Sequence, residues 1–304
     1  MKHSKGLWAA ILVTGCAAGA GDSEGTAAGT GGEGGAGGAG AGGAATSTST
    51  TSTGAGASGG GFESGTGGGN FEGTPEVFGH SKSTLYKLNP ETKAVGLVAD
   101  FTGCPPVTDI ALDATSGLFA ATDTGLYKVD KVTAACTLLK DGTYPNSLSF
   151  VPKGTLDPNE EALVGFVADQ YVRIDTQSGA ITNVGAPWNN NFISSGDVVS
   201  VKDGPTYLTI KDKDPNTSQC RDCLVQIDPA TGAIQKSFPA LSYAKVFGAA
   251  FWAGSVYGFT NDGKIFEIVV NGNQLTTTPI DTPMGLSFWG AGSTTSAPPT
   301  PSAP

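Results

Sequence analysis

The chain has 304 residues, 46 of them glycine, and its 27 acidic and 17 basic side chains leave a formal net charge of −10. Nucleic-acid-binding proteins need a basic surface to displace counterions from phosphate, so this charge balance excludes that class. It equally argues against binding to anionic membranes through a basic face, because no Lys or Arg occurs between Lys5 and Lys82.

The N-terminal residues have the composition of an export signal. Lys2 and Lys5 precede an apolar run over residues 7–13, which is too short to span a bilayer. Small residues and the first cysteine, Cys16, follow this run. The pattern predicts a secretory signal peptide over residues 1–15.

The end of this signal, Val13-Thr14-Gly15-Cys16, resembles the lipobox of bacterial lipoproteins, in which an apolar and two small residues precede the cysteine. The resemblance implies cleavage before Cys16, acylation of its thiol and its new amine, and stable anchoring through several acyl chains. It also favours the outer membrane, because Ala17 is not the acidic residue that retains enteric lipoproteins at the inner membrane. An ordinary signal peptide that is cut elsewhere, leaving Cys16 free, is the alternative.

Residues 17–73 are nearly all Gly, Ala, Ser and Thr. Such a segment cannot bury enough apolar area to offset the entropy of ordering it, so we expect residues 16–73 to be a lipidated cysteine and a disordered tether. A glycine-rich chain of this length reaches roughly 40 Å. The last residues, 293–304, suggest a second disordered tail, which leaves residues 74–292 as one folded domain.

The folded part contains a repeat. Each copy has a short run of residues that alternate in facing, a turn rich in Asn, Asp, Pro, Thr and Gly, and a second strand-like run. Examples are LYKLNPETKAVGLV and LVQIDPATGAIQKS. This is the pattern of a β-hairpin. The copies begin at Leu85, Leu126, Tyr171, Leu224 and Ile265.

Two further kinds of strand-like run accompany these hairpins. Short apolar runs that are typical of buried inner strands begin at Thr108, Asn146, Gly196, Gly248 and Gly285. Runs of the other kind, which lie between an inner strand and a hairpin, begin at Gly117, Ala162, Thr206 and Ser255. Four strands in each unit and a period of about 40–50 residues predict an all-β fold, a five-bladed β-propeller. A β-sandwich is the alternative.

The two ends of the repeat are incomplete in complementary ways. The first hairpin has only TPEVFGHS before it and no inner strand, whereas nothing follows the inner strand that begins at Gly285. We therefore expect the C-terminal strand to complete the first blade and close the ring, which removes an exposed edge. The hairpin pattern, with its LY.ID..TG consensus, resembles the repeats of quinoprotein/YVTN-type bacterial propellers, and the resemblance implies fold rather than activity.

Four cysteines remain after Cys16: Cys104, Cys136, Cys220 and Cys223. An even number in an exported protein suggests two disulfides, of which Cys104–Cys136 with Cys220–Cys223 is the simplest of three pairings. Half of a zinc site or a redox motif at CRDC is the alternative.

Few residues are suited to catalysis. His80 is the one histidine beyond the predicted signal, and we expect it at the surface or in a turn, so that no Ser/His/Asp set forms. Asp109 and Asp197 stand at equivalent positions in two inner strands, beside the expected central channel. Their oxygens could bind Ca²⁺, or they could be hydrogen-bonded turn residues.

A loop between two blades carries Trp188 followed by Asn189, Asn190 and Asn191. An aromatic ring beside side-chain amides suits the binding of a sugar or a peptide. Trp252 and Trp289 occupy equivalent positions in inner strands, where packing between blades is the expected role.

These features together predict a lipoprotein of the cell envelope that contacts the membrane through its lipid anchor only. The propeller is expected to be a binding or scaffolding module for a peptide, a glycan or a protein. A metal-assisted hydrolase of the lactonase or glycan-cleaving kind, using Asp109 and Asp197, is the alternative. A structural envelope protein without a small-molecule site is a third hypothesis.

Overall fold

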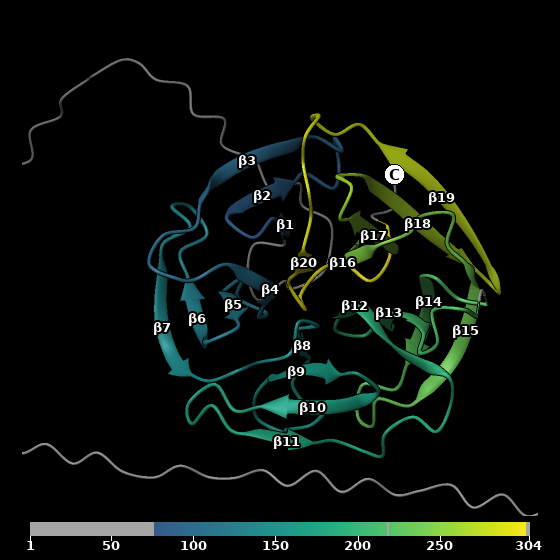
Figure 1. The fold of residues 1–304 in the computed structure, drawn as a ribbon, viewed down its shortest axis with the longest axis horizontal. Helices are drawn as coiled ribbons and strands as arrows, with labels where there is room; N and C mark the ends of the chain where they lie inside the picture. Colours follow the sequence, from purple (N-terminus) through teal and green to yellow (C-terminus); the bar gives the residue numbers. More distant parts are fainter. Residues whose placement is uncertain (1–75, 218, 302–304) are drawn as a thin grey trace, which may run out of the picture. The chain divides into compact units, whose positions relative to one another are not determined.

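The computed structural model describes residues 76–217 and 219–301, which form a ring of five four-stranded antiparallel sheets (Figure 1). The predicted signal peptide, Cys16 and the tether lie outside these residues. Nowhere in the described part is there a helix long and apolar enough to cross a membrane. The predicted five-bladed β-propeller is therefore confirmed.

Each sheet is one blade, numbered here in chain order from its first outer hairpin. Blade 1 consists of β20 (Gly290–Ser293), β1 (Val77–His80), β2 (Thr84–Leu88) and β3 (Val95–Asp100). Blade 2 consists of β4 (Val107–Leu112), β5 (Leu118–Thr122), β6 (Gly125–Val129) and β7 (Cys136–Asp141). Blade 3 consists of β8 (Ser149–Val151), β9 (Ala162–Val167), β10 (Gln170–Ile174) and β11 (Ile181–Asn183).

The last two blades have longer strands. Blade 4 consists of β12 (Phe192–Ser200), β13 (Thr206–Asp212), β14 (Cys223–Ile227) and β15 (Ile234–Ala240). Blade 5 consists of β16 (Val246–Trp252), β17 (Ser255–Thr260), β18 (Ile265–Asn271) and β19 (Gln274–Ile280). Figure 1 shows the first-mentioned strand of each blade near the centre of the ring and the last at its perimeter.

The ring closes through the two ends of the fold. Strand β20 pairs antiparallel with β1, in a register that places Val77 opposite Ser293 and His80 opposite Gly290. The closure agrees with the sequence prediction, but the paired strand begins five positions later than the expected Gly285. The apolar Phe288 is buried between blades 5 and 1, where its ring meets that of Phe259, so this stretch packs instead of pairing.

The outer hairpins of blades 1 to 4 use one turn conformation. An Asn or Asp side chain accepts hydrogen bonds from the following backbone N–H groups, and its carbonyl accepts one from the fourth residue after it. That fourth residue has a positive φ, which glycine adopts without strain. The positions are Lys93, Ala134, Gly179 and Gly232, with φ of 62°, 54°, 77° and 72°.

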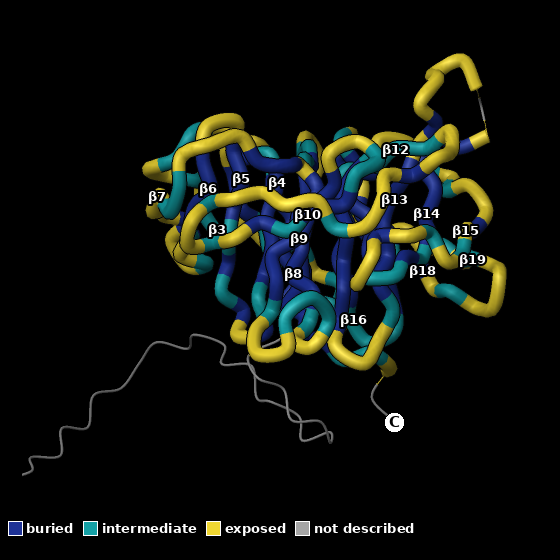
Figure 2. The backbone as a smooth tube through the Cα atoms, turned by 90° about the horizontal axis from the view of Figure 1, so that it is seen from below, coloured by how far each residue is buried: buried dark blue, intermediate teal, exposed yellow. Residues whose placement is uncertain are grey.

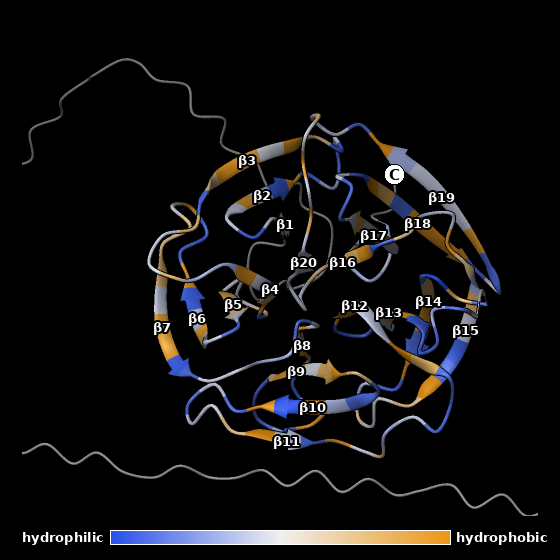
Figure 3. Ribbon diagram, in the orientation of Figure 1, coloured by the Kyte–Doolittle hydropathy of each residue, from blue (hydrophilic) through white to orange (hydrophobic). Residues whose placement is uncertain are grey.

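The apolar core is divided into five clusters, and each contains residues from two neighbouring blades. Five such clusters between five blades are what a closed ring requires. The outer strands are only partly apolar, and in Figure 3 β7 and β15 carry both hydrophobic and hydrophilic residues. Burial is accordingly concentrated between blades, and Figure 2 shows buried backbone, in dark blue, in the interior of the domain.

The ring has two faces with different roles. At the closing face β1 begins and β20 ends, because Val77 pairs with Ser293. The loop face lies opposite, and it is formed by the connections between consecutive blades and by the turns between the second and third strands of each blade. Figure 2 shows exposed backbone, in yellow, at both faces.

The C-terminal residues do not behave as the expected disordered tail throughout. Thr294 to Ala297 are buried, and Thr294 bridges to Leu112 at the end of β4. The Thr294 hydroxyl donates a hydrogen bond to Asp113 O in blade 2, and the backbone N–H of Lys202 in blade 4 donates one to Thr295 O. This polar segment crosses the closing face because backbone groups of blades 2 and 4 hydrogen-bond to the hydroxyl groups of Thr294 and Ser296 and to the carbonyl of Thr295.

Candidate functional site

Asp109 lies near the start of β4, and its side chain is completely buried at the axis. Its Oδ1 accepts a hydrogen bond from Ile110 N at 2.7 Å. Its Oδ2 accepts one from Leu148 N, 2.5 Å away, just before the inner strand of blade 3. This carboxyl group therefore ties blade 2 to blade 3.

Asp197 occupies the corresponding position in β12 and is also completely buried. Its Oδ2 accepts hydrogen bonds from Ala249 N at 3.0 Å and from Ala291 N at 2.7 Å. Ala249 belongs to β16 and Ala291 to β20, so one carboxyl oxygen joins the inner strands of three blades.

The two carboxyl groups influence one another. Burial, and then the negative charge of Asp109, raises the pKa of Asp197 well above its ordinary value, and burial also raises the pKa of Asp109. As a carboxylate, Asp197 would leave its buried Oδ1 without a donor in the described part of the chain. As a carboxylic acid it can donate from this oxygen to Asp109, so the pair is arranged to hold a proton.

His80 completes this axial group. The prediction that it lies at the surface or in a turn is wrong: at the end of β1 it is completely buried, its Nδ1 is 2.8 Å from Ser81 O, and its Nε2 is 3.9 Å from Asp109 Oδ1. Gly290 of β20 lies against both groups, and a Cβ atom there would collide with Asp109 Oδ1 and His80 Nε2. Only glycine lets the closing strand approach so near.

The axial acids thus have a structural role in this fold. Three of the four carboxyl oxygens of Asp109 and Asp197 already accept hydrogen bonds from backbone N–H groups. Across residues 76–217 and 219–301 no set of three His, Cys, Asp or Glu side chains is arranged to hold a metal ion. Calcium binding by this pair stays a prediction, and neither carboxyl group reaches solvent where a substrate could meet it.

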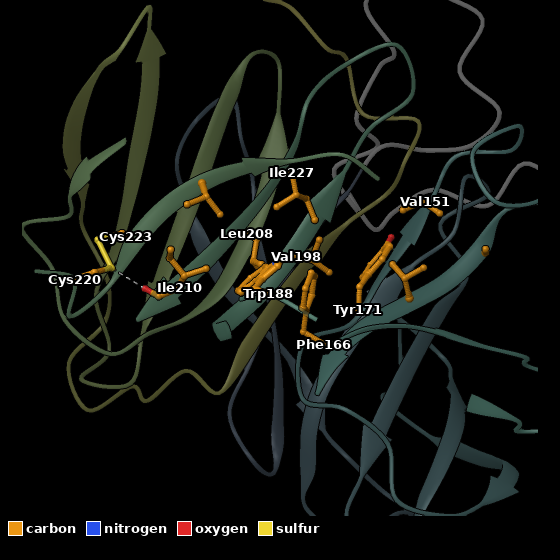
Figure 4. Packing of buried hydrophobic residues seen from close by; sticks show 13 residues of the cluster. Val151, Phe166, Tyr171, Trp188, Val198, Leu208, Ile210, Cys220, Cys223 and Ile227 are labelled. Atoms are coloured by element: carbon orange, nitrogen blue, oxygen red, sulfur yellow. Dashed lines mark hydrogen bonds between the residues drawn. A yellow bond between two sulfur atoms is a disulfide. The ribbon is translucent and has the colours of Figure 1, made fainter. Parts of the chain in front are cut away.

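Trp188 is not the exposed aromatic that the sequence suggested. Its side chain is 8% exposed, and it packs between blades 3 and 4, with its ring 5.0 Å from that of Phe166 (Figure 4). Its indole N–H donates to Gly232 O at 2.8 Å. Trp188 lies in a loop between two blades, as predicted, but its ring is buried. Burial is possible because Gly232, in the next outer turn, supplies the acceptor that a buried indole N–H needs.

The three asparagines after Trp188 are exposed on the loop face. Asn190 Oδ1 accepts a hydrogen bond from Phe192 N at 2.9 Å, and Asn191 O accepts one from Lys213 N at 2.7 Å. The side chains of Asn189 and Asn191 form no hydrogen bond with the residues that the structure describes, so both are available to a ligand. Their predicted role in binding stays a prediction.

Both predicted disulfides are present, Cys104–Cys136 and Cys220–Cys223. The first joins the connection that follows blade 1 to the outer strand of blade 2. The second closes the connection between β13 and β14, and both of its cysteines belong to the buried cluster of Figure 4. These pairings account for all four cysteines of the described chain and leave no thiolate for the zinc alternative, whereas the redox alternative at CRDC stays a prediction.

The loop face also carries a groove of about 580 Å³ that sequence patterns did not indicate. The connection between β15 and β16 and the turn between β17 and β18 form its walls, and β18 and β19 form its floor. Its principal lining residues are Tyr243, Lys245, Asp262, Lys264, Ile265 and Ile280. They come from three separate segments, so no local motif could have identified them.

No protein-family model matches the sequence, and no curated protein matches it. Among solved structures, the chain is similar to one in a crystal structure of a nidogen/laminin complex, with 9% identity over 74% of this chain and 100% of that one, at a TM-score of 0.47.

Two further structures are similar at lower scores. Hydrazine synthase from Kuenenia stuttgartiensis is 11% identical over 66% of this chain and 60% of its own, with a TM-score of 0.37. A protein of unknown function from Bacteroides caccae is 12% identical over 70% of this chain and 77% of its own, with a TM-score of 0.36. The five-bladed architecture rests on the strand pairing of this chain itself.

Proposed function

We propose that this protein is a binding module of the cell envelope, which presents the loop face of its propeller to a peptide, glycan or protein partner. The observation that carries the proposal is the pairing of Val77 with Ser293. It brings the beginning and the end of the fold to the closing face. A tether that enters there leaves the opposite face available.

The loop face has the construction expected of a binding surface. Its loops differ in length and composition, whereas the strands beneath them are buried and hydrogen-bonded to their neighbours. Variable loops on a rigid scaffold are where binding residues concentrate. The exposed Asn189, Asn190 and Asn191 and the groove beside Tyr243 both belong to this face.

Anchoring supports the same function. Acylation at Cys16 and a tether over residues 16–73, as the lipobox resemblance implies, would hold the propeller roughly 40 Å from a membrane and favour the outer membrane. The disulfides Cys104–Cys136 and Cys220–Cys223 agree with a location outside the reducing cytoplasm.

The experiment compares matched substitutions on the two faces. The immobilised full chain is used to capture components of a detergent-solubilised envelope fraction from the source organism. The double variant Asn189→Arg/Asn191→Arg alters the loop face, and Asn159→Arg, in the exposed turn between β8 and β9, alters the closing face. We expect the double variant to lose capture and Asn159→Arg to retain it.

Two outcomes would refute the proposal: equal capture by both variants, or no saturable capture by the unaltered chain. Thermal unfolding of each variant serves as the control, because none of the three side chains is buried and the melting temperature should not change.

A further inference from the structure

The groove on the loop face combines a flat aromatic surface with unequal charge. The ring of Tyr243 lies against that of Phe266, with centroids 3.8 Å apart and an interplanar angle of 7°. Phe266 is fully buried, so Tyr243 is held as one rigid wall of the groove. Such a ring offers its apolar surface to the C–H face of a sugar, while its hydroxyl group can form hydrogen bonds.

The charges of the groove do not cancel. Lys264 Nζ pairs with Asp262 Oδ2 at 2.8 Å, and the other oxygen of Asp262 accepts a hydrogen bond from the Thr260 hydroxyl. Lys245, in contrast, forms no ion pair with any residue that the structure describes. The nearby carboxyl group of Asp222 is buried and accepts a hydrogen bond from the backbone of Lys245, at 2.7 Å. One ammonium group therefore stands uncompensated in a chain of net charge −10.

The edge of the groove disfavours a peptide bound as an additional strand. Strand β19 is the outer edge of blade 5, where an extended peptide would have to pair. Pro279, which lines the groove, lies in β19 and has no N–H to donate. A compact ligand that needs no strand pairing fits this site better.

We propose that this groove binds a carboxylated sugar unit of an acidic glycan, with the sugar ring against Tyr243 and its carboxylate at Lys245. The volume of about 580 Å³ lies within the range of small-ligand sites. The polar side chains of the groove fit the same ligand, since Asp262 can accept hydrogen bonds from sugar hydroxyls. This assignment rests on the proposed binding function and specifies its ligand class.

The test is calorimetric titration of the full chain with digalacturonate, and with neutral digalactose as the uncharged counterpart. Lys245→Asn removes the charge while keeping a residue that tolerates the local φ of 58°. Its matched control is Lys153→Asn, an exposed lysine between β8 and β9 on the closing face. Tyr243→Leu removes the flat ring and keeps an apolar contact with Phe266.

We expect digalacturonate to bind the unaltered chain and the Lys153→Asn variant equally, and Lys245→Asn to bind it about five-fold more weakly in low salt. Tyr243→Leu should weaken digalacturonate and digalactose alike. Raising the salt concentration should reduce the difference between digalacturonate and digalactose, because the carboxylate–ammonium attraction is screened.

The proposal is overturned if digalacturonate does not bind, or if Lys245→Asn and Lys153→Asn bind it equally. Envelope capture by the unaltered chain separates the two hypotheses. If capture persists and depends on Asn189 and Asn191 while digalacturonate does not bind, the ligand class is wrong but the binding function stands. If capture is absent as well, both are wrong.

Discussion

Asp197 Oδ2 accepts a hydrogen bond from Ala291 N at 2.7 Å, although the two residues are 94 positions apart in the sequence. The bond joins the inner strand of blade 4 to the strand that closes the ring. Stability of the closed ring is therefore coupled to the protonation of a buried acid.

The first prediction concerns pH. Asp197 has a raised pKa in the folded chain, whereas an unfolded aspartate titrates near about 3.9. Between these two pKa values the folded state holds a proton that the unfolded state has lost. The contribution of Asp197 to the free energy of unfolding should therefore be largest below the unfolded pKa and should fall, by up to about 1.4 kcal/mol per pH unit, as pH rises towards the folded pKa.

Asp197→Asn should remove the part of the pH dependence of the free energy of unfolding that Asp197 causes. An amide permanently imitates the protonated acid, since its oxygen can accept from Ala249 and Ala291 while its NH₂ group donates to Asp109. Urea unfolding of both chains between pH 4 and pH 9 measures the difference. Parallel curves would show that Asp197 does not hold the proton.

The second prediction concerns the close approach of the closing strand. Gly290→Ala should destabilise the fold by about 2 kcal/mol or more, because a Cβ atom would meet two buried polar side chains. Gly96→Ala, in the exposed outer strand β3, is the control, since a Cβ atom there meets nothing within 4 Å. Equal midpoints of urea unfolding for the two variants would contradict this role of Gly290.

The third prediction concerns the C-terminal segment. Deleting residues 294–304 should lower the free energy of unfolding by about 3 kcal/mol. The deletion removes at least three hydrogen bonds, from Thr294 to Asp113, from Ser296 to Ala114 and from Lys202 to Thr295, each contributing about 1 kcal/mol. Deleting residues 302–304 alone should leave stability unchanged. A full deletion without effect would mean that this segment contributes nothing to closure.

The fourth prediction compares the disulfides. Cys104 and Cys136 are 32 positions apart, and Cys220 and Cys223 are 3 apart. In the chain-entropy description the longer loop stabilises by about 4 kcal/mol and the shorter by about 2 kcal/mol. Replacing the first pair by alanines should therefore lower the melting temperature more than replacing the second. The reverse order would indicate that native packing around Cys220 dominates.

The fifth prediction concerns the anchor. If Cys16 is acylated, the full chain expressed in a Gram-negative host should incorporate labelled palmitate and partition into detergent. Cys16→Ser should abolish both. A Cys16→Ser chain that still partitions into detergent would exclude the lipobox interpretation, and it would leave the propeller fold unaffected.

Much of the fold could be predicted from local patterns. The hairpins beginning at Leu85, Leu126, Tyr171, Leu224 and Ile265 all exist, because alternating residues and Asn, Asp or Gly turns specify a hairpin within a short stretch. The incomplete units at the two ends correctly indicated ring closure, and an even number of cysteines indicated the disulfides.

The errors fall where the environment of a residue depends on distant segments. The closing strand, Gly290–Ser293, reads GAGS and has no strand pattern of its own, since contact with Asp109 and His80 requires small residues there. Trp188 was expected in a ligand-binding loop and His80 at the surface or in a turn, and each is buried by a neighbouring blade or by the axis.

The sequence by itself determined the class of fold and the number of blades, and it favoured the cysteine pairing that the structure shows. Only the tertiary structure decided which polar side chains are buried, where the last strand pairs and how Tyr243 and Lys245 come to share one groove. The reason is physical. Hairpins form from contacts between residues close in the chain, whereas burial and binding surfaces depend on which blades meet once the ring has closed.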